Sequence, residues 1–76
     1  QTLLNVRVKD KNGWQDNQAI AQVVRQYTEE LGDDGQVLVR ASGTEPLIRI
    51  MAQGPNQVEL DNITEAIAEV VRKELA

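Results

Sequence analysis

Residues 36–53 of the 76-residue chain read QVLVRASGTEPLIRIMAQ, which is two strand-like segments around a short polar loop. Apolar and polar side chains alternate over residues 36–41 and again over residues 47–53, the period of a strand with one buried face. Only residues 42–46 separate the two segments, and a connection this short favours an antiparallel hairpin. The rest of the chain must then cover the apolar face of that hairpin.

A third strand and two helices are expected on either side of the hairpin. Thr2–Lys9 alternates with Leu4, Val6 and Val8 on one side, which predicts a strand with one buried face. Two further segments repeat apolar residues every three to four positions, as amphipathic helices do. Their apolar stripes are Ile20, Val23, Val24, Tyr27 and Leu31 in the first, and Leu60, Ile63, Ile67, Val70 and Val71 in the second.

Residues typical of helix ends bound both helical segments. Asp16 is the expected N-cap of the first helix, with Asn17 as the competing choice, and Gly32 supplies the left-handed residue that commonly ends a helix. Asn56 followed by Glu59 resembles the capping box of the second helix. The predicted order is strand, helix, strand, strand, helix.

An α+β fold follows: a small antiparallel sheet with both helices packed on one face is the simplest way to bury both stripes. The helices would cover Val37, Val39, Ile48 and Ile50. The opposite face would carry Leu38, Arg40, Arg49 and Met51, which is partly apolar and partly cationic. Since the chain also enters strand-like sequence directly after Gln1, we read it as a piece of a longer protein and expect another domain to cover this face.

The composition excludes several classes of function. The chain has no cysteine and no histidine, so it lacks thiolate metal ligands and the usual general base. A net charge of −4 and only two aromatic residues, Trp14 and Tyr27, argue against a nucleic-acid or anionic-membrane surface. No apolar run approaches the ~18 residues of a membrane span. We therefore expect a small soluble cytoplasmic domain without a self-contained active site.

The loop of the hairpin has the donors that a phosphate group needs. The guanidinium groups of Arg40 and Arg49 match phosphate oxygens in bidentate fashion. Ser42 and Thr44 add hydroxyl donors, and the turn at Gly43 can direct backbone N–H groups into one concavity. These five residues are the candidate phosphate-binding site.

A plain hairpin is the competing interpretation, because the hydroxyls of such loops often bond only to their own backbone. Arg49 would then pair with Glu45 or Asp10 across the sheet. Glu45 also repels a phosphate unless its carboxylate is turned outward or holds an arginine in place. The residues alone leave both interpretations open.

Residues 40–49, RASGTEPLIR, followed by Ile50 and Met51, resemble the C-terminal phosphate-binding loop of the α-D-phosphohexomutases. More narrowly, they resemble one bacterial branch of that family, whose signature is R-x-S-G-T-E-P-x-x-R. The segment NVRVK at residues 5–9 resembles the same family. Ala41 and Gln53 depart from the pattern, which often has proline and glutamate there. By this resemblance, residues 1–76 form the fourth, C-terminal domain of such an enzyme, with a TATA-binding-protein-like α+β fold.

The resemblance implies an enzyme that interconverts glucosamine 6-phosphate and glucosamine 1-phosphate through a bisphosphorylated intermediate, on the path to UDP-N-acetylglucosamine. A phosphoserine and a magnesium ion would belong to the other three domains, so this chain would hold no catalytic residue, metal ligand or cofactor. It would grip the phosphate that is not being transferred through Arg40, Ser42, Gly43 and Thr44, with Arg49 supporting or contacting it. The alternatives are a sister mutase for mannose or glucose phosphates, and a non-catalytic interaction or nucleic-acid module using Arg7, Arg40 and Arg49.

Overall fold

The computed structural model describes residues 1–75 and has three strands and two long helices. The elements are β1 (Thr2–Arg7), α1 (Gln18–Leu31), β2 (Gln36–Ala41), β3 (Leu47–Gln53) and α2 (Gln57–Glu74), with short 3-10 turns η1 (Trp14–Asp16) and η2 (Gly32–Asp34) on either side of α1. This order confirms the predicted α+β class. No helix within residues 1–75 combines the length and apolar character that a membrane crossing requires.

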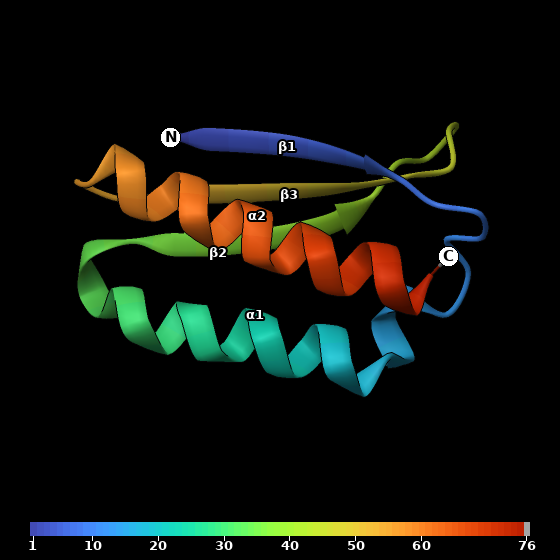
Figure 1. Ribbon diagram of the computed structural model, residues 1–76, viewed down its shortest axis with the longest axis horizontal. Helices are drawn as coiled ribbons and strands as arrows, with labels where there is room; N and C mark the ends of the chain where they lie inside the picture. The colour runs from blue at the N-terminus through green and yellow to red at the C-terminus, as the bar shows by residue number, and fades with distance from the viewer. Residues whose placement is uncertain (76) are drawn as a thin grey trace.

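The three strands form one antiparallel sheet in the order β1-β3-β2 (Figure 1). β2 and β3 are the two arms of the predicted hairpin, and β3 is the central strand because β1 pairs with its other edge. The loop between β2 and β3 and the segment that leaves β1 therefore lie at the same end of the sheet (Figure 1). This arrangement positions the candidate site.

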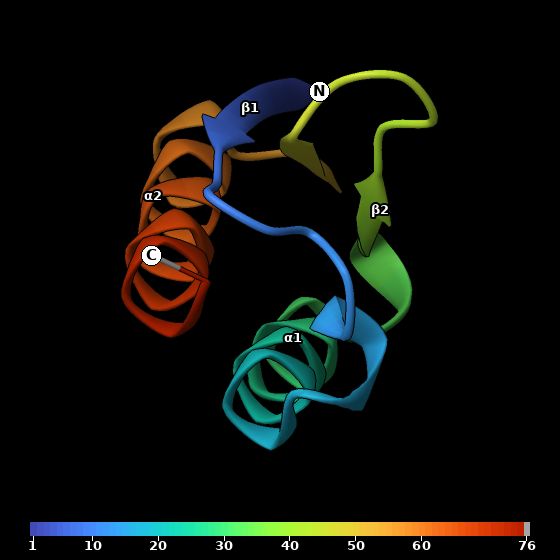
Figure 2. The same ribbon diagram turned by 90° about the vertical axis from the view of Figure 1, so that its right-hand side faces the viewer.

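Both helices lie on one face of the sheet, as the sequence predicted (Figure 2). α2 contacts β1 and β3, whereas α1 contacts β2 and the side of α2. Within residues 1–75, no helix packs against the other face of the sheet. The β2–β3 loop arches beyond the end of the sheet, away from both helices (Figure 2).

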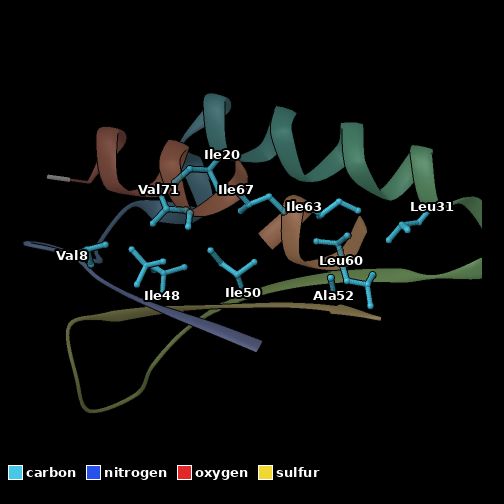
Figure 3. Close-up of a cluster of buried hydrophobic side chains, with 13 residues drawn as sticks. Val8, Ile20, Leu31, Ile48, Ile50, Ala52, Leu60, Ile63, Ile67 and Val71 are labelled. Atoms are coloured by element: carbon cyan, nitrogen blue, oxygen red, sulfur yellow. The ribbon is translucent and has the colours of Figure 1, made fainter. Parts of the chain in front are cut away.

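The core lies between the sheet and the helices, and β3 and α2 contribute most of it (Figure 3). Ile48, Ile50 and Ala52 of β3 are fully buried. The buried apolar residues are Val6, Val8, Ile20, Leu31, Val37, Ile48, Ile50, Ala52, Leu60, Ile63, Ile67, Ala68 and Val71, and Thr64 of α2 is buried with them. The middle of α1 and Val39 are only half-buried, because α1 covers the outer strand of a narrow sheet.

Two predicted element boundaries were wrong. The first strand ends at Arg7 rather than Lys9, although the N–H of Val8 still donates to the carbonyl of Pro46 at 2.9 Å. The cap of α1 is Asn17, whose side chain accepts the N–H of Ile20 at 3.0 Å. Asp16 does not cap α1, because it belongs to the 3-10 turn before it.

The remaining predicted helix ends are confirmed. Gly32 ends α1 with a φ of 58°, in the region that favours glycine, and its N–H donates to the carbonyl of Thr28. The side chain of Asn56 accepts the N–H of Glu59 at 3.0 Å and so caps α2. Within residues 1–75 the backbone N–H of Asn56 does not donate to the Glu59 carboxylate in return, so only half of a capping box forms.

Candidate functional site

Arg40 and Arg49 are direct partners across β2 and β3, on the sheet face opposite the helices. Both side chains are exposed. The ion pairs found within residues 1–75 are Arg7–Glu45 and Arg72–Glu69, so neither of these two guanidiniums has a carboxylate within 4.0 Å. Like charges directly opposite in a sheet repel, and an anion placed between them would relieve that repulsion.

An apolar hollow borders the two arginines on the same face of the sheet. It has a volume of about 270 Å³ and is lined by Leu3, Leu38, Arg40, Arg49 and Met51. Strand register explains it, because Leu3 and Leu38 both pair with Met51, one step along the face from the pairing of Arg40 with Arg49. The predicted open face, partly apolar and partly cationic, is confirmed. Its cover by another domain stays a prediction.

The loop over residues 42–46 is held by its own hydrogen bonds. The N–H of Ser42 donates to the carbonyl of Leu47 at 2.9 Å, and the N–H of Leu47 donates to the carbonyl of Glu45 at 2.8 Å. The N–H of Glu45 donates to Oγ of Ser42 at 3.3 Å. Because Ser42 accepts in this last bond, its hydroxyl hydrogen is still available to donate to a ligand.

The tip of the loop presents donors without acceptors. Within the described residues, no acceptor bonds to the N–H groups of Gly43 and Thr44 or to the hydroxyl of Thr44. Both residues are exposed. Two successive amides and a hydroxyl directed to solvent can converge on one anion.

Nothing within the described chain requires glycine at position 43. A Cβ there would meet no atom within 4 Å, and the glycines with positive φ are Gly13 and Gly32. The absence of a side chain at Gly43 therefore matters only to a group that approaches the loop from outside, such as a ligand.

Sequence reasoning missed Lys11 as a part of this site. Its ammonium nitrogen Nζ donates to the backbone carbonyl of Ser42 and, at 3.1 Å, to that of Glu45. Lys11 lies in the segment between β1 and η1, 31 residues before Ser42. The antiparallel pairing of β1 with β3, which brings this segment to the loop, was the signal that could have found it.

The expected partners of Arg49 in the plain-hairpin interpretation do not contact it. Glu45 instead forms an ion pair with Arg7, with 3.9 Å between Nη2 and Oε2, and Asp10 accepts the backbone N–H of Asn12 at 2.9 Å. The carboxylate of Glu45 therefore lies beside Arg7 of β1, and within the described residues it forms no ion pair with Arg40 or Arg49. Both side chains of this ion pair are largely exposed, so it contributes little to stability.

Four of the eight basic side chains gather at the loop end of the sheet, although the chain carries a net charge of −4. Arg7, Lys11, Arg40 and Arg49 lie there, and so do the carboxylates of Glu45 and, in the segment after β1, of Asp10. Asp33 and Asp34 belong to η2, which connects α1 to β2 at the opposite end of the sheet from the loop (Figure 1). Such an uneven distribution attracts anions to the loop end. Within residues 1–75 no three His, Cys, Asp or Glu side chains gather where they could hold a metal ion.

Comparison with known proteins shows which family the chain resembles. Residues 3–70 match the family profile described as "Phosphoglucomutase/phosphomannomutase, C-terminal domain". The chain is 48% identical over 75 residues to a phosphoglucosamine mutase of Brevibacillus brevis and 49% identical over 75 residues to one of Symbiobacterium thermophilum. Each match covers 99% of this chain and 17% of the relative.

Solved structures agree with the sequence relatives. The chain is similar to an N-acetylglucosamine-phosphate mutase, described as a member of the alpha-D-phosphohexomutase superfamily in its substrate complex, with a TM-score of 0.60 and 29% identity. That match covers 93% of this chain and 15% of the solved one. The chain thus spans about a sixth of the length of the proteins it matches.

Proposed function

Because the chain belongs to the phosphoglucomutase/phosphomannomutase family, whose C-terminal domain it matches, we propose that it is the phosphate-binding domain of a phosphoglucosamine mutase. The observation that carries this proposal is the direct pairing of Arg40 with Arg49 beside a loop whose tip amides have no acceptor within residues 1–75. A tetrahedral anion with a double negative charge would satisfy both features at once.

Each candidate residue has a distinct part in holding the phosphate. Arg40 binds two phosphate oxygens with its guanidinium, and Arg49, across the strand pair, neutralises the remaining charge. The hydroxyls of Ser42 and Thr44 and the backbone N–H of Gly43 donate from the loop side. A single site of this kind binds an isolated phosphosugar with a Kd on the order of millimolar.

The role within the whole enzyme is to hold the phosphate that is not being transferred. The substrates would be glucosamine 6-phosphate and glucosamine 1-phosphate, exchanged through a bisphosphorylated intermediate in the cytoplasm as a step toward UDP-N-acetylglucosamine. A magnesium ion and a phosphoserine would reside in the other three domains and supply the phosphoryl transfer. This domain would add affinity for the substrate and drive closure over it. Because uniform binding lowers KM more than it raises kcat, its contribution would appear mainly in KM.

The nearest alternative to this proposal concerns the sugar, which would be glucose or mannose rather than glucosamine. The family profile is named for glucose and mannose phosphates, whereas the relatives at 48% and 49% identity are phosphoglucosamine mutases. In this proposal the site binds a phosphate and contacts little of the sugar, so the preference for glucosamine rests on these relatives.

Kinetics of the full-length enzyme test the proposal. Arg40→Ala should raise KM for the sugar phosphate at least tenfold, corresponding to the loss of about 1.4 kcal/mol of binding free energy, and lower kcat less. Arg25→Ala is the matched control, since Arg25 is an exposed arginine on α1, away from the loop. An unchanged KM in Arg40→Ala would remove this domain from substrate binding.

A non-catalytic module that binds nucleic acid is the alternative from another class. Arg7, Arg40 and Arg49 all lie on the open face of the sheet, but no aromatic side chain lies on the three strands. Binding of a labelled RNA or DNA oligonucleotide at moderate salt, with an affinity that Arg40→Ala reduces, would favour this alternative. We expect no such binding.

A further inference from the structure

We infer that Lys11 is a positioning residue that holds the phosphate-binding loop in its binding shape, an inference that rests on the proposed function. Its ammonium bonds to two backbone carbonyls of the loop, those of Ser42 and Glu45. It reaches them from the segment after β1, so it connects the loop to the body of the domain. No other side chain outside the loop bonds to the loop backbone within residues 1–75.

The geometry separates the donors of the loop from its acceptors. Each peptide unit of the loop carries both an N–H donor and a carbonyl that repels an anion. Lys11 binds the carbonyls at the two ends of the four-residue stretch from Ser42 to Glu45, and so fixes the direction in which those oxygens point. The N–H groups of Gly43 and Thr44, between these two positions, lack an acceptor within the described chain.

The same two bonds lower the conformational cost of binding. A loop that must order around its ligand loses affinity, because the ordering entropy is subtracted from the contact free energy. Lys11 is itself half-buried, and its two charge-assisted bonds are of the stronger kind. Lys11 therefore acts through the loop and need not touch the phosphate.

A titration with inorganic phosphate, followed by amide NMR on the 76-residue chain, tests this role. Lys11→Met keeps the length of the side chain but removes both bonds. We expect its Kd for phosphate to rise about tenfold, and the Gly43 and Thr44 amide resonances to move already without phosphate. Lys11→Arg, which can still donate to both carbonyls, should recover most of the affinity.

Lys9→Met is the matched control, because it removes the same charge two residues away. The backbone N–H of Lys9 bonds to the carbonyl of Leu75, and its exposed side chain makes no bond to the loop. Lys9→Met should change the Kd less than twofold and leave the two loop resonances in place.

Several outcomes would overturn the inference. An unchanged Kd in Lys11→Met would do so, and so would equal losses in Lys11→Met and Lys9→Met, since these would show an effect of charge alone. Both results leave the proposed function intact as long as Arg40→Gln abolishes phosphate binding. If the wild-type chain binds no phosphate, the proposed function and the role of Lys11 fail together.

Discussion

Arg40 on β2 and Arg49 on β3 stand directly opposite each other with no carboxylate within 4.0 Å of either guanidinium among the residues described. Such a pair opposes folding, since like charges in facing positions repel. The arginine pair lies beside a loop in which the N–H groups of Gly43 and Thr44 have no acceptor within the described residues. Binding of an anionic ligand by the two arginines explains why the pair is present there. The repulsion then lowers the free energy of unfolding of the ligand-free domain, and a bound anion raises it again.

Arg40→Gln should therefore stabilise the ligand-free chain while it abolishes phosphate binding. Removing one of two facing charges relieves about 0.2–1 kcal/mol of repulsion, which corresponds to an increase in Tm of about 1–8 °C for a domain of this size. Thermal unfolding at low ionic strength, with and without phosphate, measures both effects. Arg40→Lys is the control, because it keeps the charge and loses only the bidentate geometry. A lower Tm in Arg40→Gln would mean that the arginines support the fold.

Two glycines should respond in opposite ways to substitution by alanine. Gly43→Ala should leave Tm unchanged, since its Cβ would meet no atom within 4 Å, and weaken phosphate binding by blocking the loop amides. Gly35→Ala should lower the free energy of unfolding by about 1–3 kcal/mol, because its Cβ would lie 2.3 Å from the carbonyl oxygen of Gln53. Thermal melts and phosphate titrations of the two variants test this. Tight phosphate binding by Gly43→Ala would exclude the loop amides from the site.

Glu45→Gln should strengthen phosphate binding about two- to fivefold at low salt, because it removes a carboxylate from the loop itself. The backbone bonds that Glu45 makes in the loop do not depend on its side chain. Its ion pair with Arg7 is largely exposed, so Tm should change little. Calorimetric titrations with phosphate at 20 mM and 500 mM salt check this, and the gain should vanish at the higher salt as charges are screened. Weaker binding would show that the Glu45 side chain shapes the loop.

Asn17→Ala should destabilise the chain by about 1 kcal/mol, since it removes the N-cap of α1. Asp16→Ala should have an effect within about 0.5 kcal/mol, as expected for an exposed residue without a capping bond. Urea unfolding of both variants separates the two positions. Equal losses would place part of the capping at Asp16.

The sequence predicted the layers of this fold because the signals are periodic. Alternation around Ile48 and Ile50 and the stripe from Leu60 to Val71 each need only local spacing, and the buried core confirms both. The cap of α1 was harder to assign, since Asp16 and Asn17 are both good cap residues and only the turn before them decides which one is used.

In the candidate site, too, features that depend on local spacing could be predicted, and contacts between distant segments could not. Arg40 and Arg49 were found from type and spacing, because hairpin register follows from a short loop. Lys11 could not be found from residue type and spacing, since its bond to Ser42 spans 31 residues and depends on the order of the strands. The pairing of Glu45 with Arg7, likewise, required the position of β1 beside β3.

A titration of the wild-type chain with phosphate, observed by amide NMR, tests the central claim most directly. The account predicts chemical-shift changes confined to residues 40–44 and Arg49, saturating with a Kd on the order of millimolar. Shifts spread over the whole sheet, or none near Gly43 when the rest of the spectrum shows a folded domain, would contradict it.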